Sequence, residues 1–390
     1  MNQLTLITNA EVYAPEALGT RALLVAGERI VWMGEKAPKL PKELECETLD
    51  LEGARLVPGL IDCHAHITGG GGEMGMRSKV PPVVLSRFTR GGVTSVIGVL
   101  GTDDTTRTTA ELLARAHGLN EEGLSAWCHS GGYHVPPTTL TGSVRGDIVH
   151  LERCIGIGEV AISDHRSSQP TLDEILRLAA DAHVAGLMTG KAGVLHLHVG
   201  DGERGLELVR RALEQSEIPP RTFHPTHTNR KRRLFDEALA LAKSGCTIDV
   251  TAYPIEKGED AWSAEDAIER FLDSGLPRER LTASTDGGGC LPILDEEKRI
   301  VSMDVGDPAM LAKALQKLLK RGRALEDVLP IFTSNPARLF RLSSKGRIAT
   351  GADADLVVLD KSGAVRDVMA RGRWHVRAGK QLVRGMFEPV

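Results

Sequence analysis

Two histidines, His64 and His66, stand one strand period apart at the end of an apolar run that begins at Leu56. Side chains at positions i and i+2 of a strand point to the same face, so both imidazoles can reach one metal ion. A parallel α/β sheet places its active site at the carboxyl ends of its strands, and neutral imidazole is a common zinc ligand. The spacing therefore indicates a metal-dependent hydrolase.

Further imidazoles and carboxylates occur in later apolar runs of the chain. A catalytic metal site needs such ligands together with an open position for water. A lone histidine is more often structural than a ligand, but several candidates in successive runs favour one shared site with enough ligands for two ions. The candidates are His64, His66, Glu159, His198, His227 and Asp286. His196 shares a strand face with His198 and is an alternative ligand.

The apolar runs alternate with stretches of helical periodicity, which is typical of a parallel barrel. Helical stretches at 171–185, 205–215, 234–243 and 309–320 carry apolar residues on one side and predict outer helices. We predict an α/β fold with a TIM-like (β/α)₈ barrel over residues 56–344. Its strands are expected within 56–66, 92–101, 124–132, 159–166, 194–201, 223–230, 246–253 and 281–289.

The two ends of the chain have a different pattern. Residues 1–55 and 345–390 contain short β-rich segments, such as 23–32, 354–359 and 365–383, separated by turn residues. We predict that both ends combine into one small β domain beside the barrel.

Composition excludes several classes of function. The 390 residues are 41% hydrophobic and 26% charged with a formal net charge of -4, which is typical of a globular protein and does not favour nucleic acid as a partner. The first residues lack the pattern of a secretory signal, and no apolar run is long enough to span a membrane. Six cysteines without a CxxC pair are expected to be reduced thiols, so we predict a cytoplasmic protein without a membrane partner.

Several motifs resemble a known family. The segment Pro58–His66, the single histidines of later strands and Asp286 resemble the amidohydrolase superfamily. The resemblance to the isoaspartyl dipeptidases is closer and extends along nearly the whole chain. It rests on residues 69–73 (Gly-Gly-Gly-Gly-Glu), 100–103 (Leu-Gly-Thr-Asp), 132–136 (Gly-Tyr-His-Val-Pro), 162–166 (Ile-Ser-Asp-His-Arg), 198–201 (His-Val-Gly-Asp), 225–230 (Pro-Thr-His-Thr-Asn-Arg) and 286–287 (Asp-Gly).

The resemblance implies a site with two Zn²⁺ ions, although a single ion is an alternative. On the family's pattern His64, His66 and Asp286 hold the first metal, and His198 and His227 hold the second. An acidic group of the fourth strand, here Glu159, bridges them. A metal-activated hydroxide is then the nucleophile, because paired ions lower the pKa of their shared water and polarise the scissile carbonyl. Asp286 is the expected general base and acid, and Tyr133 the expected hydrogen-bond donor to the oxyanion.

The same resemblance implies hydrolysis of β-aspartyl dipeptides by a homo-oligomer. Glu73 is expected to bind the substrate ammonium and Thr102 the β-aspartyl end, whereas Arg166 and Arg230 bind the carboxylate of the leaving amino acid. These residue types suit a small zwitterionic dipeptide, because a guanidinium forms bidentate pairs with a carboxylate.

Two positions depart from the family's pattern. Glu159 stands where the isoaspartyl dipeptidases usually carry a carboxylated lysine, and its shorter side chain requires a closer approach of its strand. Cys290 stands where a hydroxyl is expected to help bind the substrate carboxylate. Two alternatives follow from these departures. One is a related amidohydrolase that cleaves another N-acyl amino acid, dipeptide or cyclic amide, and the other is a metal-poor binding homologue without catalysis.

Overall fold

Eight parallel strands form a closed barrel in the computed structural model, which describes residues 4–256, 258–294 and 300–389. Six of them form one sheet, and two more form a parallel pair that completes the ring. The backbone N–H of Thr228 donates to Asp249 on one side of that pair, and the N–H of Asp286 donates to His64 on the other. The strands are β6 (Leu60–Ala65), β7 (Val93–Gly98), β8 (Ser125–Ser130), β9 (Cys154–Ile162), β10 (Val194–Val199), β11 (Phe223–Thr226), β12 (Ile248–Thr251) and β13 (Leu281–Ser284).

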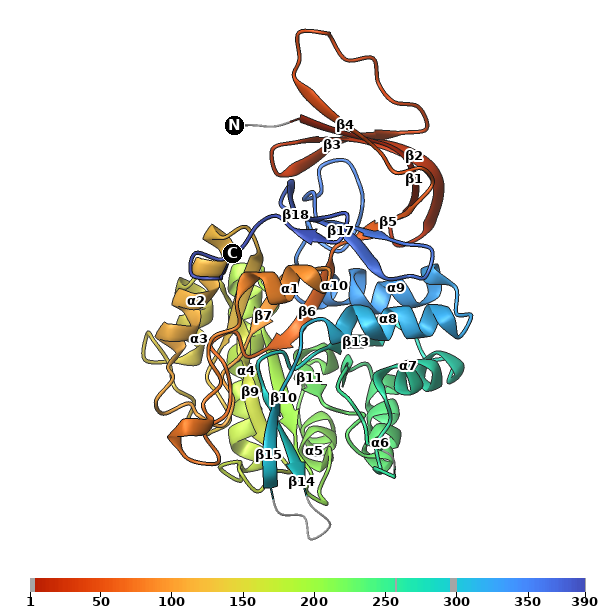
Figure 1. Ribbon diagram of the computed structural model, residues 1–390. Coiled ribbons are helices and arrows are strands. Elements are labelled where there is room, and N and C mark those ends of the chain that lie inside the picture. Colours follow the sequence, from red (N-terminus) through yellow and green to blue (C-terminus); the bar gives the residue numbers. More distant parts are fainter. Residues whose placement is uncertain (1–3, 257, 295–299, 390) are drawn as a thin grey trace.

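This arrangement confirms the predicted TIM-like α/β fold, with one barrel strand in each of the eight predicted runs. Helices surround the barrel, as Figure 1 shows, and the four helical stretches expected from periodicity are α4, α5, α6 and α8. The helices are α1 (Leu85–Arg90), α2 (Thr109–Glu121), α3 (Val144–His150), α4 (Leu172–Thr189), α5 (Glu207–Gln215), α6 (Arg232–Lys243), α7 (Ala264–Asp273), α8 (Met310–Lys320), α9 (Leu325–Phe332) and α10 (Ser334–Leu339).

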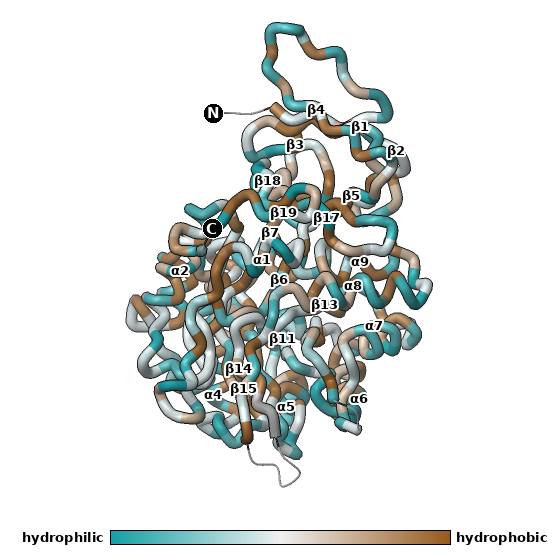
Figure 2. The backbone as a smooth tube through the Cα atoms, viewed as in Figure 1, coloured by the Kyte–Doolittle hydropathy of each residue, from teal (hydrophilic) through white to brown (hydrophobic). Residues whose placement is uncertain are grey.

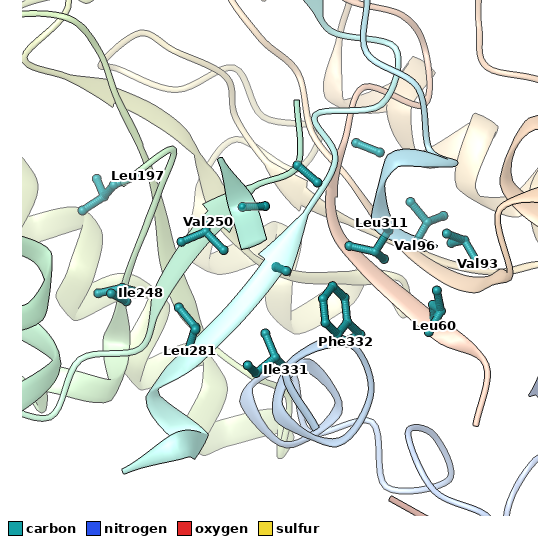
Figure 3. Close-up of a cluster of buried hydrophobic side chains, with 14 of the residues drawn as sticks. Leu60, Val93, Val96, Leu197, Ile248, Val250, Leu281, Leu311, Ile331 and Phe332 are labelled. Carbon is teal, nitrogen blue, oxygen red and sulfur yellow. The ribbon is translucent and has the colours of Figure 1, made fainter. Parts of the chain in front are cut away.

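The core lies between the barrel strands and these helices. Leu60 of β6 and Leu281 of β13 are buried, together with Ile331 and Phe332 of α9 (Figure 3). Outer helices such as α6 alternate hydrophilic and hydrophobic segments along the chain (Figure 2), so that one face packs on the strands and the other meets solvent. This packing fixes the strands, and therefore the side chains at their ends.

Both ends of the chain contribute to a second, nine-stranded sheet, which lies at one end of the barrel (Figure 1). β5 joins the two contributions, because it pairs in parallel with β1 and antiparallel with β16. The sheet contains β1 (Leu4–Tyr13), β2 (Ala17–Ala26), β3 (Arg29–Gly34), β4 (Cys46–Asp50), β5 (Arg55–Pro58), β16 (Leu356–Leu359), β17 (Val365–Ala370), β18 (Arg373–Arg377) and β19 (Lys380–Gln381). The predicted β domain built from both termini is therefore present.

One predicted strand is two strands. The apolar run 56–66 contains β5, which belongs to the terminal sheet, and β6, which belongs to the barrel, and the chain changes sheets at Gly59. A side chain could not be accommodated there, since a Cβ on Gly59 would lie 2.0 Å from Oγ1 of Thr94. The division into 1–55 with 345–390 and 56–344 stays a prediction, and its residues 1–3, 257, 295–299 and 390 lie outside the described ones.

A hairpin that the sequence did not predict follows β13. It consists of β14 (Cys290–Leu294) and β15 (Ile300–Val305), which pair antiparallel, and it extends from the barrel on the side away from the terminal sheet (Figure 1). All six cysteines have free thiols. No helix in the described part of the chain combines the length and the apolarity of a membrane span.

Candidate metal centre and active site

The barrel interior brings all six predicted metal ligands together. Nε2 of His66 lies 3.3 Å from Oε1 of Glu159 and 3.0 Å from Oδ1 of Asp286. Nε2 of His64 lies 3.5 Å from both carboxylates. His198 and His227 also approach Glu159, with a ring nitrogen at 3.1 Å and 3.7 Å from its Oε2. Glu159 therefore lies between two pairs of histidines, as a bridging ligand must.

A bulge in β9 places Glu159 in this position. The register between β9 and β10 shifts between Leu195 and Leu197, so that three residues of β9 span two residues of β10. Gly158, inside this bulge, has a φ of 144°, and a Cβ on it would lie 2.5 Å from the carbonyl oxygen of His196. Glycine thus allows the close approach that a glutamate needs at a position where lysine would reach further. β9 begins at Cys154, five residues before the predicted run, so Glu159 is an interior strand residue and not its first one.

Unpartnered polar atoms show that this cluster fits a cation. Nε2 of His64, Nε2 of His227, Oε1 of Glu159 and Oδ1 of Asp286 are buried and have no hydrogen-bond partner among the described residues. Such atoms are costly to bury unless a ligand satisfies them. The geometry groups His64 and His66 with Glu159, and His198 and His227 with the same carboxylate, each as possible metal ligands.

The charges of the cluster agree with this interpretation. Burial lowers the pKa of His64 and His227 and lowers that of His198 to about 3, so these imidazoles are neutral and offer lone pairs. Burial, together with the nearby charge of Asp286, raises the pKa of Glu159 well above its ordinary value. A divalent cation between the two carboxylates would remove that penalty.

Two residues outside the predicted set orient the second pair of histidines. Nδ1 of His227 lies 2.7 Å from the hydroxyl of Thr251, which leaves Nε2 directed at Glu159. Nε2 of His198 lies 3.0 Å from Oδ2 of Asp164, which leaves Nδ1 for the cluster. Partners of this kind fix the tautomer of a metal-binding histidine. Asp164 lies in the motif 162–166, whereas Thr251 lies in the predicted run 246–253, which contains none of the predicted ligands.

Asp286 is held as an acceptor at the mouth of the barrel. Burial alone would raise the pKa of this carboxyl, but its contacts with His64 and His66 hold it well below the ordinary value. Its backbone φ of 54° is unusual for a residue other than glycine, and His227 has a similar φ of 60°.

Asp62, which is fully buried, supports the residue before Asp286. Its carboxylate accepts hydrogen bonds from the backbone N–H and the hydroxyl of Thr285.

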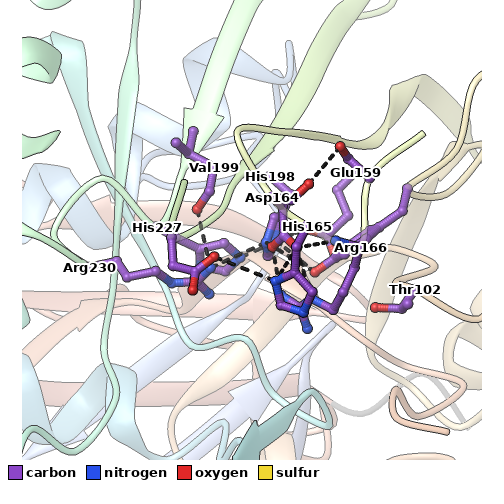
Figure 4. Close-up of polar contacts among 12 residues, drawn as sticks. Thr102, Glu159, Asp164, His165, Arg166, His198, Val199, His227 and Arg230 are labelled. Atoms are coloured by element: carbon purple, nitrogen blue, oxygen red, sulfur yellow. Dashed lines mark hydrogen bonds and ion pairs between the residues drawn. The ribbon is translucent and has the colours of Figure 1, made fainter. Parts of the chain in front are cut away.

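Two predicted substrate residues, Thr102 and Arg166, both contact a third, Glu73. Oε1 of Glu73 accepts hydrogen bonds from the hydroxyl of Thr102 at 3.0 Å and from Nη1 of Arg166 at 3.2 Å. Arg166 also donates from Nε and Nη2 to the two oxygens of Asp164, at 3.0 and 2.8 Å. Figure 4 shows Arg166 and Asp164 directly beside His198 and Glu159. We call Glu73, Thr102, Arg166 and Arg230 the substrate rim. The rim carries both negative and positive charge beside the metal cluster.

Tyr133 and Arg230 lie on the His198 side of the site. The Tyr133 hydroxyl is 2.8 Å from Nδ1 of His198, and burial raises its pKa well above the ordinary value, so it remains a donor. Nη1 of Arg230 donates to the carbonyl oxygen of Val199 at 3.2 Å and lies 3.3 Å from Nε2 of His198 (Figure 4).

Cys290 lies at the start of β14, and its thiol donates to the carbonyl oxygen of Ser78 at 3.8 Å. Burial and the charge of Glu73 raise its pKa to about 11, so it is a protonated thiol. Gly71 packs directly on it, since a Cβ there would lie 2.7 Å from its sulfur. The absence of a side chain at Gly71 thus allows close packing against the start of β14.

His196 does not face the cluster. Its Nε2 lies 2.7 Å from Nδ1 of His64, and its Nδ1 lies 2.9 Å from Nδ1 of His224. Both nitrogens are therefore used inside the barrel, and this geometry favours His198 as the ligand.

Comparison with known proteins agrees with this site. Residues 55–375 match the model of the amidohydrolase family. A β-aspartyl dipeptidase from Fervidobacterium islandicum AW-1, solved with a β-Asp-Leu dipeptide, is 42% identical over 98% of both chains, with a TM-score of 0.92. An imidazolonepropionase from Ruegeria sp. is 24% identical and covers 87% of each chain. A dihydropyrimidinase from Brevibacillus agri shares the fold, with a TM-score of 0.68 at 16% identity. The chain belongs to the amidohydrolase family and, within it, groups with the β-aspartyl dipeptidases.

Proposed function

We propose that the protein hydrolyses the isopeptide bond of β-aspartyl dipeptides in a metal-dependent reaction. One observation carries this proposal: Glu73, Arg166 and Arg230 surround a cluster of metal-ligand type, so that acid and guanidinium groups border the reacting position. The full-length similarity to the Fervidobacterium islandicum dipeptidase, which was solved with β-Asp-Leu, supports the same substrate class.

We assign two Zn²⁺ ions to the cluster. His64, His66 and Asp286 would hold one and His198 and His227 the other, with Glu159 between them. Neutral imidazoles with carboxylates form a donor set that suits zinc. When bound, the ions would acidify a water molecule and polarise the scissile carbonyl.

The side chains of the protein would move the protons. Asp286 is a buried carboxylate with Oδ1 unpartnered, so it can accept a proton from the attacking water and return it to the leaving amine. Tyr133 keeps its proton and can donate a hydrogen bond to the developing oxyanion after leaving His198.

The rim would select the substrate by charge. A β-aspartyl dipeptide carries one ammonium and two carboxylates. Glu73 can accept from the ammonium, Thr102 lies beside it for the β-aspartyl end, and Arg166 and Arg230 can each pair with a carboxylate. Cys290 would add only a weak donor at the carboxylate end.

Steady-state hydrolysis by zinc-reconstituted protein tests the proposal. β-Asp-Leu is the test substrate, α-Asp-Leu and N-acetyl-leucine are the controls, and the metal content is measured in the same sample. We expect selective cleavage of β-Asp-Leu, and none by the metal-free protein. Failure to cleave it by protein that holds its metal would refute the substrate assignment, and failure to retain metal would favour a binding homologue.

A second candidate is the hydrolysis of a cyclic amide. The full-length similarity to imidazolonepropionases favours it, although at 24% identity. The charged pair of Glu73 and Arg166 argues for the dipeptide, because it offers a partner for an ammonium. An imidazolone substrate in the same assay separates the two candidates.

We further propose a cytoplasmic homo-oligomer. The six scattered free thiols suit a reducing compartment. The oligomer is expected from the family resemblance, and the mass of the protein in solution tests it.

A further inference from the structure

A line of buried histidines runs from the metal cluster into the barrel. Nδ1 of His64 contacts Nε2 of His196 at 2.7 Å, and Nδ1 of His196 contacts Nδ1 of His224 at 2.9 Å. All three rings are fully buried. The proposed function uses only the first of them, so the other two need an explanation.

The line ends on a carboxylate. Nε2 of His224 lies 3.0 Å from the hydroxyl of Thr282, and that hydroxyl donates to Oδ1 of Asp249 at 2.6 Å. Oδ1 also accepts from the thiol of Cys63 at 3.1 Å, and Oδ2 accepts from Thr226 at 2.7 Å and Ser284 at 2.6 Å. Four donors surround Asp249, which suits a charged carboxylate buried far from solvent.

The same residues could be taken for another metal site, because Cys63, His224 and Asp249 have ligand atoms within 4.8 Å of one another. Their hydrogen bonds argue against it. Both ring nitrogens of His224 are used, and each oxygen of Asp249 already accepts two hydrogen bonds. The atoms of the main cluster, in contrast, are unpartnered.

The contacts between the rings give this line a direction. Each of the two N···N contacts, at 2.7 and 2.9 Å, has the length of a hydrogen bond, which forms when one nitrogen carries a proton and the other offers its lone pair. A neutral imidazole has one N–H and one lone pair, so a ring that accepts on one side donates on the other. Only two arrangements of the protons are then possible. If Thr282 donates to Asp249, it accepts from Nε2 of His224, and His224 in turn accepts from His196.

His196 then accepts from Nδ1–H of His64, which leaves the lone pair of His64 on Nε2, the atom that faces Glu159 and Asp286. The reverse arrangement would put a proton on that atom and would take the Thr282 donor away from Asp249. We propose that Asp249 is a positioning residue for the first metal, acting through Thr282, His224 and His196 to hold His64 in its metal-binding tautomer. This inference rests on the metal dependence of the proposed function and not on its substrate.

Thr282→Val tests the relay, because valine keeps the shape of threonine but cannot connect His224 to Asp249. Thr226→Val is the matched control: the same change at a fully buried threonine that also donates to Asp249 but lies outside the relay. Zinc affinity of the metal-free proteins is measured by competition with a chelator, without any substrate. We expect Thr282→Val to weaken binding of one ion about 10- to 100-fold, Thr226→Val to change it less than about 3-fold, and Thr282→Ser to restore it. Equal effects of the two valine variants, or none for Thr282→Val, would overturn the relay.

A second measurement needs no variant of the relay. Nitrogen-15 NMR of the metal-free protein labelled on its histidines reports which ring nitrogen carries the proton. The relay predicts Nδ1–H for His64 and His196 and Nε2–H for His224. The opposite set would refute it even if Thr282→Val failed to fold. Loss of β-Asp-Leu cleavage with a normal zinc affinity would instead concern only the substrate proposal.

Discussion

The metal cluster and the substrate rim of the same site are built in different ways. The cluster stands on or directly after barrel strands, and side chains such as His64 and Glu159 have no exposed surface. The rim stands on loops, where the side chains of Glu73 and Arg166 remain 18% and 25% exposed. Strand ends fix ligand positions closely, whereas loops can change without disturbing the barrel. We infer that the chemistry is set by the strands and the choice of substrate by the loops.

The largest effect is expected for Asp286→Asn, a substitution in the metal cluster. Asparagine keeps the shape of the side chain but cannot take up a proton, so kcat should fall about 10²- to 10⁴-fold. Asp201→Asn, at an aspartate whose side chain is 66% exposed, is the control. Steady-state kinetics with β-Asp-Leu measure the effect, and circular dichroism checks the fold. Unimpaired turnover would disprove the proton-transfer role.

Glu159→Gln tests whether one carboxylate serves both ions. Loss of the shared charge should lower zinc affinity at least about 10- to 100-fold, because the loss of a residue that only orients a metal ligand already costs that much. The activity should fall together with the bound zinc. Metal content after dialysis measures this change.

Glu159→Lys asks whether the family's usual bridge can be rebuilt on this strand. If the lysine is carboxylated, added bicarbonate should raise bound metal and activity above those of Glu159→Gln. A lysine variant that gains neither would show that the bulge of β9 accommodates only the shorter acid.

Arg166→Lys addresses the rim. Lysine keeps the charge but loses the bidentate contact, so KM for β-Asp-Leu should rise about 10-fold while zinc affinity stays unchanged. Arg233→Lys, at a side chain that is 71% exposed, is the matched control. A fall in bound zinc in Arg166→Lys would show that rim and cluster are not separate.

A smaller effect is expected on stability, because the buried histidines of the barrel interior make the free energy of unfolding depend on pH. Burial lowers the pKa of His129 to about 3 and that of His224 to about 4, below the ordinary value of 6.5. Between about pH 6.5 and about pH 4 the unfolded chain therefore binds more protons than the folded one, so the free energy of unfolding falls as the pH falls.

His129→Phe should reduce the slope of the free energy of unfolding against pH by up to one proton, about 1.4 kcal/mol per pH unit. Phenylalanine suits the position, because the ring of His129 packs against Phe340 and its nitrogens lack partners among the described residues. Urea unfolding of the metal-free proteins across this range measures it. An unchanged slope would mean that His129 is not a source of the acid sensitivity.

The sequence predicted the metal-ligand residues on the barrel strands better than the residues that orient them through hydrogen bonds. Period-two spacing and apolar runs located the barrel strands, and the runs that hold His64, His198 and Asp286 are strands or strand ends in the structure. The split of the first run at Gly59 was missed, because two consecutive apolar strands of different sheets look like one.

The supporting residues were missed for a different reason. Thr251, Thr282 and Asp249 act through contacts between neighbouring strands, which no local pattern encodes. The bulge at Gly158, which brings Glu159 to the histidines, likewise depends on the register with β10. The fold and the residue types of the site could thus be predicted, but the hydrogen bonds that orient them could not.

The most direct test is anomalous X-ray diffraction from crystals of the zinc-loaded protein. We predict two peaks, one beside His64, His66 and Asp286 and one beside His198 and His227, each in contact with an oxygen of Glu159. A single peak away from Glu159, or a peak at Cys63, His224 and Asp249, would contradict both the shared metal centre and the relay that is proposed to support it.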